Sequence, residues 1–365
     1  MNTQQSPPAL QRRDRRVSSA VRGRYLPPEW APQSGVMLTW PHGRSEWADQ
    51  LEQVEAVYVE LACCIAHREK VLIVCLDPDH CRRVRERLLS AGIDDHQLDL
   101  RAFPSNDTWA RDHGPVTVRV DGELHLLDFR FNGWGNKYPA ELDNAITKCL
   151  HEDGAFDMRQ REEIDMVLEG GSIEVDGAGT LLTTQRCLLA PTRNPQLGRE
   201  QIERRLIELL GVTRILWLQH GAIPGDDTDG HIDTLARFCD EHTILYVAGD
   251  RDGRTDELDA MERELAALRG ADGMPYRLVA LPHPRPLIDG AGQQLPVSYA
   301  NFLIINDAVL VPVYGDPADK EALQRIGACF PARQIIAIDA RPLIQQRGGI
   351  HCAAMHLPAG VLPRC

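Results

Sequence analysis

Residues 112–129, DHGPVTVRVDGELHLLDF, show the pattern on which most of the chain is built. A polar residue opens the stretch, a short apolar strand follows, and a polar turn leads back into a second apolar strand. Two apolar runs separated by a tight polar turn predict a β-hairpin. The same order returns in three later stretches, EGGSIEVDGAGTLLTT from Glu169, HIDTLARFCDEHTILYV from His231 and NFLIINDAVLVPVY from Asn301.

The turns and the spacing of these stretches support a repeated unit. Asp-Gly occurs at 121–122 and again at 176–177, and glycine favours tight hairpin turns because it adopts positive φ without steric cost. Asp240 and Asn306 mark the two weaker turns. The units and Cys352 begin 51 to 70 residues apart, a period that indicates a recurring supersecondary unit.

Helical patterns lie between the hairpins. Apolar residues recur at helical spacing in residues 47–69, 198–210, 255–269 and 317–329, which predicts amphipathic helices. The fold class is therefore mixed α/β, with hairpins and helices alternating around a centre; an ordinary open α/β sheet without symmetry is the alternative. Since no break in composition divides the chain, we predict one catalytic domain over residues 25–362. The Pro/Gly-rich loop at 282–296 is a candidate lid or insertion.

Bulk composition excludes several classes of function. The net charge of −13 disfavours nucleic-acid binding, which selects basic surfaces, and suits a small cationic substrate. We find no apolar run of the roughly 18 residues that a membrane span needs. Residues 1–24 are polar and basic, with QRRDRR at 11–16 and no apolar segment of a secretory signal, so we expect a disordered tail. The ten cysteines contain no C-x-x-C pair and indicate reduced thiols in a cytoplasmic protein.

The residues that open the repeated units carry the candidate chemistry. They are Asp112, Glu169, His231 with Asp233, and Cys352. Carboxylates bind a planar guanidinium through paired N–H donors, and several acids in one site need a cation to offset their repulsion. A thiol beside a histidine is a nucleophile–base pair. Together these groups favour attack of sulfur on a positively charged carbon.

Each opener also has a structural interpretation. Asp112 precedes Gly-Pro and is able to shape a turn, Glu169 precedes two glycines and suits a surface loop, and a strand histidine such as His231 is commonly structural. Cys352 has a structural interpretation too, because cysteines are commonly buried. The spacing in GDDTDGHID does not fit a calcium loop, and residues 351–356 lack the four-ligand spacing of structural zinc. We expect no metal and no organic cofactor.

Seven motifs in order resemble those of one known family. They are NDTWARDHGP, FNGWG, LEGGSIEVDGAGTLLTT, RNPQLGREQIE, DDTDGHIDT, SYANFLI and GGIHC. Over residues 25–360 the chain is similar to the agmatine deiminase family, which includes bacterial peptidylarginine-deiminase-type members of the guanidine-modifying superfamily. The resemblance implies a five-bladed α/β propeller with pseudo-fivefold symmetry, the pentein-like fold.

The resemblance also implies roles for the openers. Cys352 is the expected nucleophile and His231 the general acid and base. Asp112, Asp233 and Glu169 are expected to hold the guanidinium, and Trp109 to line the substrate channel. No cofactor is implied.

The chain departs from the family pattern where the far end of a substrate would bind. Asp227 replaces a glutamate, and Arg347 precedes a shortened glycine run. An amine end, as in agmatine, requires an acid, whereas an arginine or peptide carboxylate requires a cation, for which Arg130 and Arg347 are candidates. Agmatine is the favoured substrate. Arginine or peptidylarginine deimination, amidino transfer and a non-catalytic binding protein are the alternatives, and the oligomeric state, including a homo-oligomer, is left open.

Overall fold

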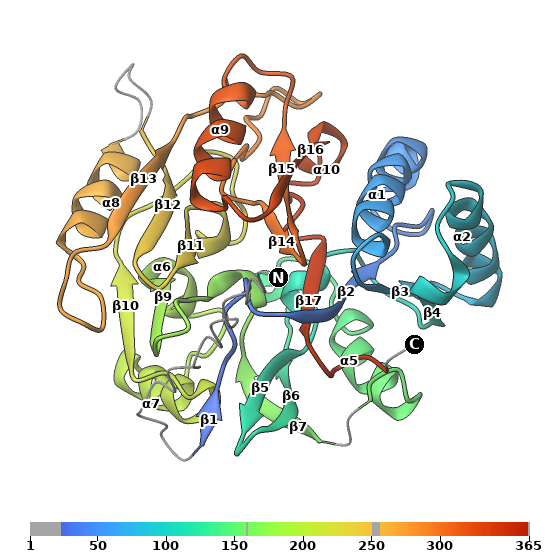
Figure 1. Cartoon of the computed structure of the whole chain (residues 1–365), viewed down its shortest axis with the longest axis horizontal. Coiled ribbons are helices and arrows are strands. Elements are labelled where there is room, and N and C mark those ends of the chain that lie inside the picture. Colours follow the sequence, from blue (N-terminus) through green and yellow to red (C-terminus); the bar gives the residue numbers. More distant parts are fainter. Residues whose placement is uncertain (1–22, 158–159, 250–255, 364–365) are drawn as a thin grey trace, which may run out of the picture.

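The computed structural model describes residues 23–157, 160–249 and 256–363 of the 365-residue chain, and Figure 1 shows how they are arranged. Most of the predicted disordered tail, residues 1–22, lies outside the described residues. The prediction extends the tail to residue 24, but Arg24 pairs with Val120 in an antiparallel ladder. It therefore belongs to the short strand β1, Arg24–Tyr25.

The described strands form five sheets of three or four strands, and four of these sheets contain the predicted hairpins. In each of the four, an antiparallel hairpin is extended by a strand parallel to its second member; β1 adds an edge strand to the first. In chain order the strands are β5 (Val116–Val120), β6 (Glu123–Arg130), β7 (Arg161–Val167); β8 (Glu174–Val175), β9 (Thr180–Thr184), β10 (Arg214–Leu218); β11 (Ala236–Asp240), β12 (Thr243–Val247), β13 (Arg277–Leu281); and β14 (Leu303–Ile305), β15 (Ala308–Val313), β16 (Gln334–Asp339).

The fifth sheet brings together the two ends of the described chain. The C-terminal strand β17 (Ala354–Pro358) runs antiparallel to β2 (Gln33–Thr39), and the two lie side by side in Figure 1. Parallel strands β3 (Lys70–Cys75) and β4 (Leu98–Ala102) complete this sheet. It thus repeats the plan of the other four, with the antiparallel pair supplied by distant segments instead of a hairpin.

A helix connects the second and third strands of each sheet, and these helices lie on the outside of the molecule in Figure 1. They are α1 (Leu51–Ala66), α5 (Asp143–Glu152), α7 (Arg199–Leu210), α8 (Asp256–Ala267) and α9 (Asp319–Cys329). The four predicted helical stretches are confirmed as α1, α7, α8 and α9. Neither α5 nor α2 (Pro78–Ser90) was expected, because each carries few apolar side chains on its buried face.

The shorter helical turns lie in the connections between the longer elements, and two of these turns hold the candidate residues Asp112 and Asp233. They are α3 (Ala110–His113), α4 (Gly133–Asn136), α6 (Gln185–Leu188), α10 (Arg341–Ile344), η1 (Ala48–Gln50), η2 (Asp95–Gln97), η3 (Gly170–Ser172) and η4 (Ile232–Thr234).

The predicted turn chemistry is present in the hairpins. Asp121 and Gly122 both adopt positive φ, 51° and 94°, in the β5–β6 turn. Gly177 does so between β8 and β9, with φ of 70°. These angles match the tight turns that let two strands pair in register.

The second strand of each antiparallel pair is deeply buried. Leu38, Leu127, Leu182, Leu245 and Leu310 lie on these five strands, and each is fully inaccessible to solvent. Burying one such side chain contributes on the order of 1.5–3 kcal/mol. Each of these buried strands is hydrogen-bonded to the first strand of its pair and so holds that first strand in place.

Across the described ranges, every helix falls short of the length and apolarity that crossing a bilayer demands. The nine described cysteines are all free thiols.

Candidate active site

The predicted residues occupy equivalent places in the fold, at the entry to the first strand of an antiparallel pair. Asp112 lies in α3 before β5, and Glu169 directly precedes η3 before β8. His231 and Asp233 flank the start of η4 before β11, and Cys352 lies two residues before β17. Because α3 contacts η3 and β17, and η3 contacts η4, these entries meet in one place.

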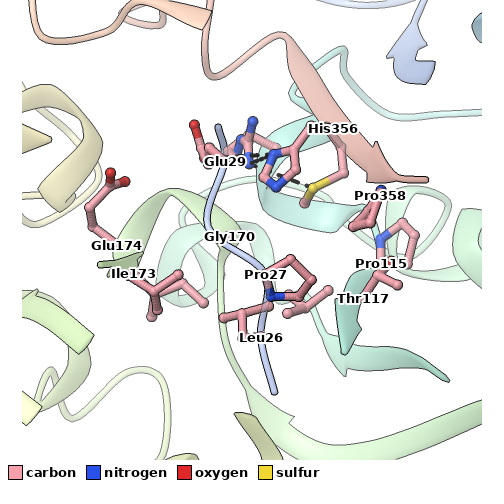
Figure 2. A pocket seen from close by; sticks show the side chains of 14 residues that line it. Leu26, Pro27, Glu29, Pro115, Thr117, Gly170, Ile173, Glu174, His356 and Pro358 are labelled. Carbon is pink, nitrogen blue, oxygen red and sulfur yellow. Dashed lines mark hydrogen bonds and ion pairs between the residues drawn. The ribbon is translucent and has the colours of Figure 1, made fainter. Parts of the chain in front are cut away.

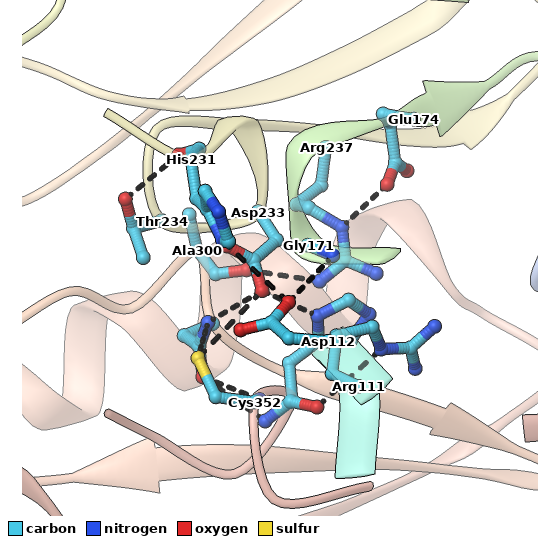
Figure 3. Close-up of polar contacts among 12 residues, drawn as sticks. Arg111, Asp112, Gly171, Glu174, His231, Asp233, Thr234, Arg237, Ala300 and Cys352 are labelled. Atoms are coloured by element: carbon cyan, nitrogen blue, oxygen red, sulfur yellow. Dashed lines mark hydrogen bonds and ion pairs between the residues drawn. The ribbon is translucent and has the colours of Figure 1, made fainter. Parts of the chain in front are cut away.

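Gly171 lies at the point where three of these side chains converge. A β-carbon built on Gly171 would lie 2.7 Å from His231 Nδ1, 2.9 Å from Asp112 Oδ1 and 3.0 Å from Asp233 Oδ2. Only glycine leaves room for this approach, which explains the Gly-Gly that follows Glu169. Figure 3 shows Asp112, His231, Asp233 and Cys352 drawn together from separate segments.

The thiol of Cys352 lies beside an acid and an amide. Its Sγ is 3.7 Å from Asp233 Oδ2 and receives a hydrogen bond from Asn301 Nδ2 at 3.2 Å. Burial raises the pKa of Cys352 well above its ordinary value, and the charges of Asp233 and Asp112 raise it further. A bound cation would oppose both effects, so the thiolate is favoured when a guanidinium occupies the site.

His231 is fully buried and lies on the other side of this group, with Nδ1 3.7 Å from Asp112 Oδ1. Burial acts to lower the pKa of His231, but Asp112, Cys187 and Glu169 raise it well above 6.5. The ring is therefore an imidazolium at neutral pH. Neither ring nitrogen has a hydrogen-bond partner among the described residues.

The two aspartates are held differently. Asp112 Oδ2 accepts from Trp134 Nε1 at 2.9 Å, and its Oδ1 accepts from the backbone N–H of Gly171 at 3.0 Å. Asp233 Oδ2 accepts from His351 Nδ1 at 2.8 Å, whereas its Oδ1 is buried without a partner in the described chain. Burial acts to raise the pKa of Asp233, but His351 lowers it overall, which keeps this carboxyl ionised.

Glu169 was predicted to hold the guanidinium of a substrate, but in the structure it is paired with an arginine of the chain. Both of its carboxylate oxygens accept from Arg193 Nε, at 2.9 and 3.0 Å, and the pair is completely buried. Arg193 also bonds Asp229 at 2.7 Å. Glu169, like His231 and Asp233, does not line the cavity described below. Glu169 differs from those two residues because the chain itself supplies it with a guanidinium, that of Arg193.

Glu169, Cys187 and His231 have side chains of the kinds that bind metal ions, but the charge next to them is unfavourable for a metal ion. Ligand atoms of Glu169, Cys187 and His231 lie within 4.8 Å of one another. Glu169 already bonds the permanent cation Arg193, and a metal ion beside that guanidinium would be repelled. This group therefore does not fit a cation, and the expectation of a metal-free reaction stays a prediction.

A cavity of about 260 Å³ leads to Cys352 and Asp112. Trp109, Asp227 and Arg347 line it, as the sequence suggested for the substrate channel. Its other lining residues are Glu46, Asp107, Trp134, Tyr138, Thr228, Thr234, Gln345, Gln346 and Gly348. Flat aromatic walls and carboxylates together suit an alkyl chain that carries a cation.

Arg130 lies elsewhere. Its side chain is 61% exposed and pairs with Asp165 on the surface, and it does not line the cavity. Of the two arginines predicted as partners for a substrate carboxylate, the structure brings only Arg347 to the site.

The outer part of the cavity contains groups of both charges. Tyr138 donates to Asp227 Oδ2 at 2.8 Å, and Arg347 Nη2 donates to Gln293 Oε1 at 2.8 Å. Gln293 belongs to the predicted lid loop, in which Leu295 N–H bonds Leu287 O at 2.8 Å. The loop therefore touches a cavity-lining residue, and its closure over a substrate stays a prediction.

Behind the nucleophile lies a buried ionic cluster centred on Glu29. Its carboxylate accepts from Arg237, from His351 Nε2 at 2.8 Å and from Arg111 Nη1 at 3.1 Å. Glu29 and Arg111 also line a second cavity of about 40 Å³, into which Figure 2 looks past Pro27 and Ile173. His351 hydrogen-bonds both Asp233 and Glu29. The cluster therefore holds Asp233 in position from the side away from the substrate cavity.

Removing the Glu29 charge is expected to destabilise the fold. Glu29→Ala leaves Arg111 buried without its carboxylate and leaves Arg237 with Glu174 as its remaining acid, and breaking a buried ion pair from one side costs about 3–5 kcal/mol. Urea unfolding should show this loss, whereas Glu52→Ala, on the exposed face of α1, should change the free energy of unfolding by less than about 0.5 kcal/mol. A Glu29→Ala protein as stable as the Glu52→Ala control would contradict the role of Glu29 in holding the buried ionic cluster together.

Several site residues were not identified from the sequence. Asn301 had a signal, since it opens the fourth repeated unit, yet it carries neither charge nor nucleophile. Trp134 lies in the FNGWG motif without any indication that it would bond Asp112. Glu29 precedes the first long strand in a stretch without periodicity, so only the folded chain shows its contacts.

Comparison with known proteins gives a consistent result. The family model of Porphyromonas-type peptidyl-arginine deiminase matches residues 25–358. The agmatine deiminase of Stutzerimonas stutzeri is 36% identical, over 92% of this chain and 96% of that protein. A Porphyromonas gingivalis structure assigned as an arginine deiminase is 48% identical, covers 93% of this chain and 100% of its own, and has a TM-score of 0.86. A Cys-to-Ser variant of C. jejuni agmatine deiminase, solved with substrate bound, is 35% identical, covers 92% and 97%, and has a TM-score of 0.85. The chain belongs to the Porphyromonas-type peptidyl-arginine deiminase family.

Proposed function

We propose that this chain is a hydrolase that deiminates a guanidinium substrate, agmatine before others, through a covalent bond to Cys352. The observation that carries the proposal is a set of buried polar atoms without hydrogen bonds, in the group of side chains that converges with the thiol. Asp233 Oδ1 and both ring nitrogens of His231 are buried without hydrogen-bond partners in the described chain, although His231 Nδ1 lies 3.7 Å from Asp112 Oδ1. Buried polar groups without partners are rare and call for an explanation, and a guanidinium between the thiol and the imidazole supplies one.

The mechanism follows from these positions. Asp112 and Asp233 accept N–H groups of the guanidinium, and the Cys352 thiolate forms a C–S bond with its central carbon. The His231 imidazolium gives its proton to one nitrogen, the C–N bond breaks, and ammonia leaves behind a cationic thiouronium. Neutral His231 then takes a proton from water, whose oxygen attacks the same carbon. The C–S bond breaks, the thiolate and imidazolium are restored, and the remaining proton leaves with ammonia as ammonium.

This arrangement revises the expected role of Glu169. Its carboxylate lies close to His231 and is bonded to Arg193. We propose that Glu169 favours the charged form of His231, as the first step requires, and that the guanidinium of the substrate is held by the two aspartates.

The propeller interpretation belongs to the same proposal. Five sheets share one strand plan, and each has a helix between its second and third strands. We propose that they are five blades related by pseudo-fivefold symmetry. The site residues would then converge because each stands at the same position of a different blade.

Charge favours agmatine over arginine. Four acids and one arginine line the cavity, a formal excess of three negative charges. Burial raises the pKa of Asp107 to about 6, so this carboxyl is still mostly ionised at pH 7. Agmatine carries a guanidinium and an ammonium, and such a dication matches the excess better than the zwitterionic end of arginine does.

Arg347 is the one cation among the described residues that line the cavity, and it favours a carboxylate-bearing substrate, which gives a direct prediction. In Arg347→Ala, kcat/KM for agmatine should rise about 3- to 10-fold, because a partly exposed like charge near the ammonium is worth on the order of 1 kcal/mol. Hydrolysis of a peptide with C-terminal arginine should fall by a similar factor. Arg130→Ala, which removes a guanidinium outside the cavity, is the matched control and should change neither value. An unaltered ratio of the two activities in Arg347→Ala would contradict a role in substrate choice.

The proposed function is tested by measuring ammonia release from agmatine, free arginine and a peptide with C-terminal arginine, side by side. We expect agmatine to be fastest, and mass spectrometry of acid-quenched enzyme to find the thiouronium on Cys352. Faster turnover of arginine or the peptide would overturn the choice of agmatine. Release of ammonia from none of the three would overturn the deiminase itself.

An added amine acceptor separates hydrolysis from amidino transfer. We expect the ureido product in its presence, because in the proposed mechanism His231 takes a proton from water, which then attacks the thiouronium carbon. Recovery of a new guanidine made from the acceptor would favour the transferase.

A further inference from the structure

Arg111 and Thr117 line the small cavity behind the nucleophile (Figure 2) and have hydrogen-bonding capacity that the chain does not use. Arg111 lies in α3 and Thr117 in β5, and their exposed fractions are 2% and 4%. Arg111 Nη2 and Thr117 Oγ1 have no hydrogen-bond partner among the residues that the structure describes. Buried polar atoms are seldom left in this state, so their presence on one cavity wall indicates a polar ligand.

The other two nitrogens of the Arg111 guanidinium already bond the chain. Nε donates to His351 O at 3.5 Å, and Nη1 donates to Glu29 Oε1 at 3.1 Å and to His356 Nδ1 at 3.0 Å. Burial lowers the pKa of His356 to about 3, so its ring is neutral and this nitrogen accepts. Each terminal nitrogen of a guanidinium carries two N–H donors, and both donors of Nη2 therefore remain for a ligand.

The charges around the cavity favour an anion. The acids Glu29 and Glu174 line the cavity, and both pair with Arg237. Burial raises the pKa of Glu174 to about 8 in spite of Arg237, so this carboxyl is mostly protonated at pH 7. Burial also acts to raise the pKa of Glu29, but Arg237 and the other cations beside it hold that pKa well below its ordinary value. The guanidinium groups of Arg111 and Arg237 thus share one carboxylate charge, which leaves an excess of positive charge.

The remaining wall and the size of the cavity limit what the anion can be. In Figure 2 the apolar side chains of Leu26, Pro27 and Ile173 lie together, apart from Glu29 and His356. The cavity has a volume of about 40 Å³, and one water needs roughly 10–15 Å³, so about three water-sized groups fit. A carboxylate with a short alkyl tail matches both the size and the divided wall, whereas a phosphate or sulfate has no apolar part.

The chain makes room for Arg111 in this position. A β-carbon at Gly170, which also lines the cavity, would lie 2.2 Å from Arg111 O and 3.3 Å from its Cδ, so any other residue there would displace the arginine. The backbone N–H of Arg111 donates to Cys352 O at 3.1 Å, and Asp112 follows Arg111 in the chain. The cavity therefore adjoins the candidate active site from behind.

We propose that this cavity binds a small aliphatic carboxylate, whose oxygens accept hydrogen bonds from Arg111 Nη2 and Thr117 Oγ1. Its alkyl tail lies against Leu26, Pro27 and Ile173. The site is separate from the substrate cavity, since the two have no described lining residue in common. It goes beyond the proposed deimination, in which neither Arg111 nor Thr117 takes part.

Acetate is the probe for this site, and its binding is followed by saturation-transfer NMR on the methyl group at constant ionic strength. Acetamide is the neutral probe of the same size. We expect the wild type to bind acetate with a Kd on the order of 1–10 mM, as four non-hydrogen atoms allow. Acetamide should bind at least about 10-fold more weakly, because a charged acceptor forms the stronger hydrogen bonds with a guanidinium.

Thr117→Val and Ile173→Phe test the polar and the apolar part of the site. Thr117→Val keeps the shape of the side chain and removes a hydroxyl that bonds nothing in the described chain, so it should fold normally and bind acetate about 10-fold more weakly. Ile173→Phe fills the cavity and should reduce binding below detection. Ile164→Phe is the matched control, because Ile164 lies in the same apolar cluster, is also 8% exposed and does not line the cavity; it should bind acetate as the wild type does.

Failure of the wild type to bind acetate would overturn the inference, as would wild-type affinity in either Thr117→Val or Ile173→Phe. Equal losses in Ile173→Phe and Ile164→Phe would also overturn it, because they would show a general effect of the larger side chain. Loss of binding in Arg347→Ala would place the acetate in the substrate cavity instead. Since binding is measured without turnover, failure to release ammonia from any guanidino compound would remove the deiminase and leave this site standing.

Discussion

Cys352→Ala is expected to lower ammonia release from agmatine by at least about 10³-fold, a loss as large as that of any other single substitution in the site. The sulfur is the one thiol on the wall of the substrate cavity, among the residues that the structure describes. Without it, the carbon retains its binding carboxylates and the His231 proton but has no atom to form the covalent bond. Initial rates of ammonia release at saturating agmatine measure the loss, and the thiouronium should be absent from the mass spectrum.

The fold should survive this change. Replacing a small buried thiol with alanine removes one heavy atom, so the unfolding midpoint is expected to stay close to that of the wild type. Cys64→Ala is the matched control, because Cys64 is a half-buried thiol on α1 outside the cavity, and it should retain full activity. A Cys352→Ala enzyme that turns over agmatine at the wild-type rate would show that the nucleophile has been assigned to the wrong residue.

The sequence predicts the fold well where the pattern is local. A hairpin needs only two apolar runs and a suitable turn, so the pairs that follow Asp112, Glu169, His231 and Asn301 are all present. The pairing of β17 with β2 has no local signal, because the two strands come from opposite ends of the chain. Likewise Arg130 and Arg347 look alike in the sequence, and only the folded chain shows that one lines the cavity while the other pairs with Asp165.

In the candidate site, too, local features were predictable from the sequence and long-range contacts were not. Charged and nucleophilic residues at repeated positions were identifiable because their chemistry is evident from the residue type. The partners of these residues were not. That Glu169 bonds Arg193, that His351 connects Asp233 to Glu29, and that Asn301 faces the sulfur depend on contacts between residues 24 to 322 positions apart along the chain. Such contacts decide whether a carboxylate receives the substrate or another side chain, which residue type alone leaves open.

His231→Gln should reduce agmatine hydrolysis about 10²- to 10⁴-fold, the usual contribution of a general acid–base residue. The raised pKa of His231 makes the ring a proton donor at neutral pH, and the departing nitrogen needs that proton. The same residue then serves as the base toward water. A single substitution thus impairs both the release of ammonia and the hydrolysis of the thiouronium. A substrate whose leaving group needs no proton from His231 distinguishes the two steps.

An S-methylthiouronium analogue of agmatine makes this separation, because methanethiol leaves without a proton from the enzyme. In His231→Gln we expect a burst of about one methanethiol per active site, because bond breaking no longer depends on the imidazolium. Turnover should then stop, because the thiouronium on Cys352 lacks a base to activate water. Rapid-quench detection of methanethiol and the mass of the trapped enzyme give the two readings, with His242→Gln, at an exposed histidine after β11, as the control that turns over normally. Steady turnover of the analogue by His231→Gln at the wild-type rate would remove His231 from the hydrolytic step, and the buried, unpartnered ring nitrogens would need another explanation.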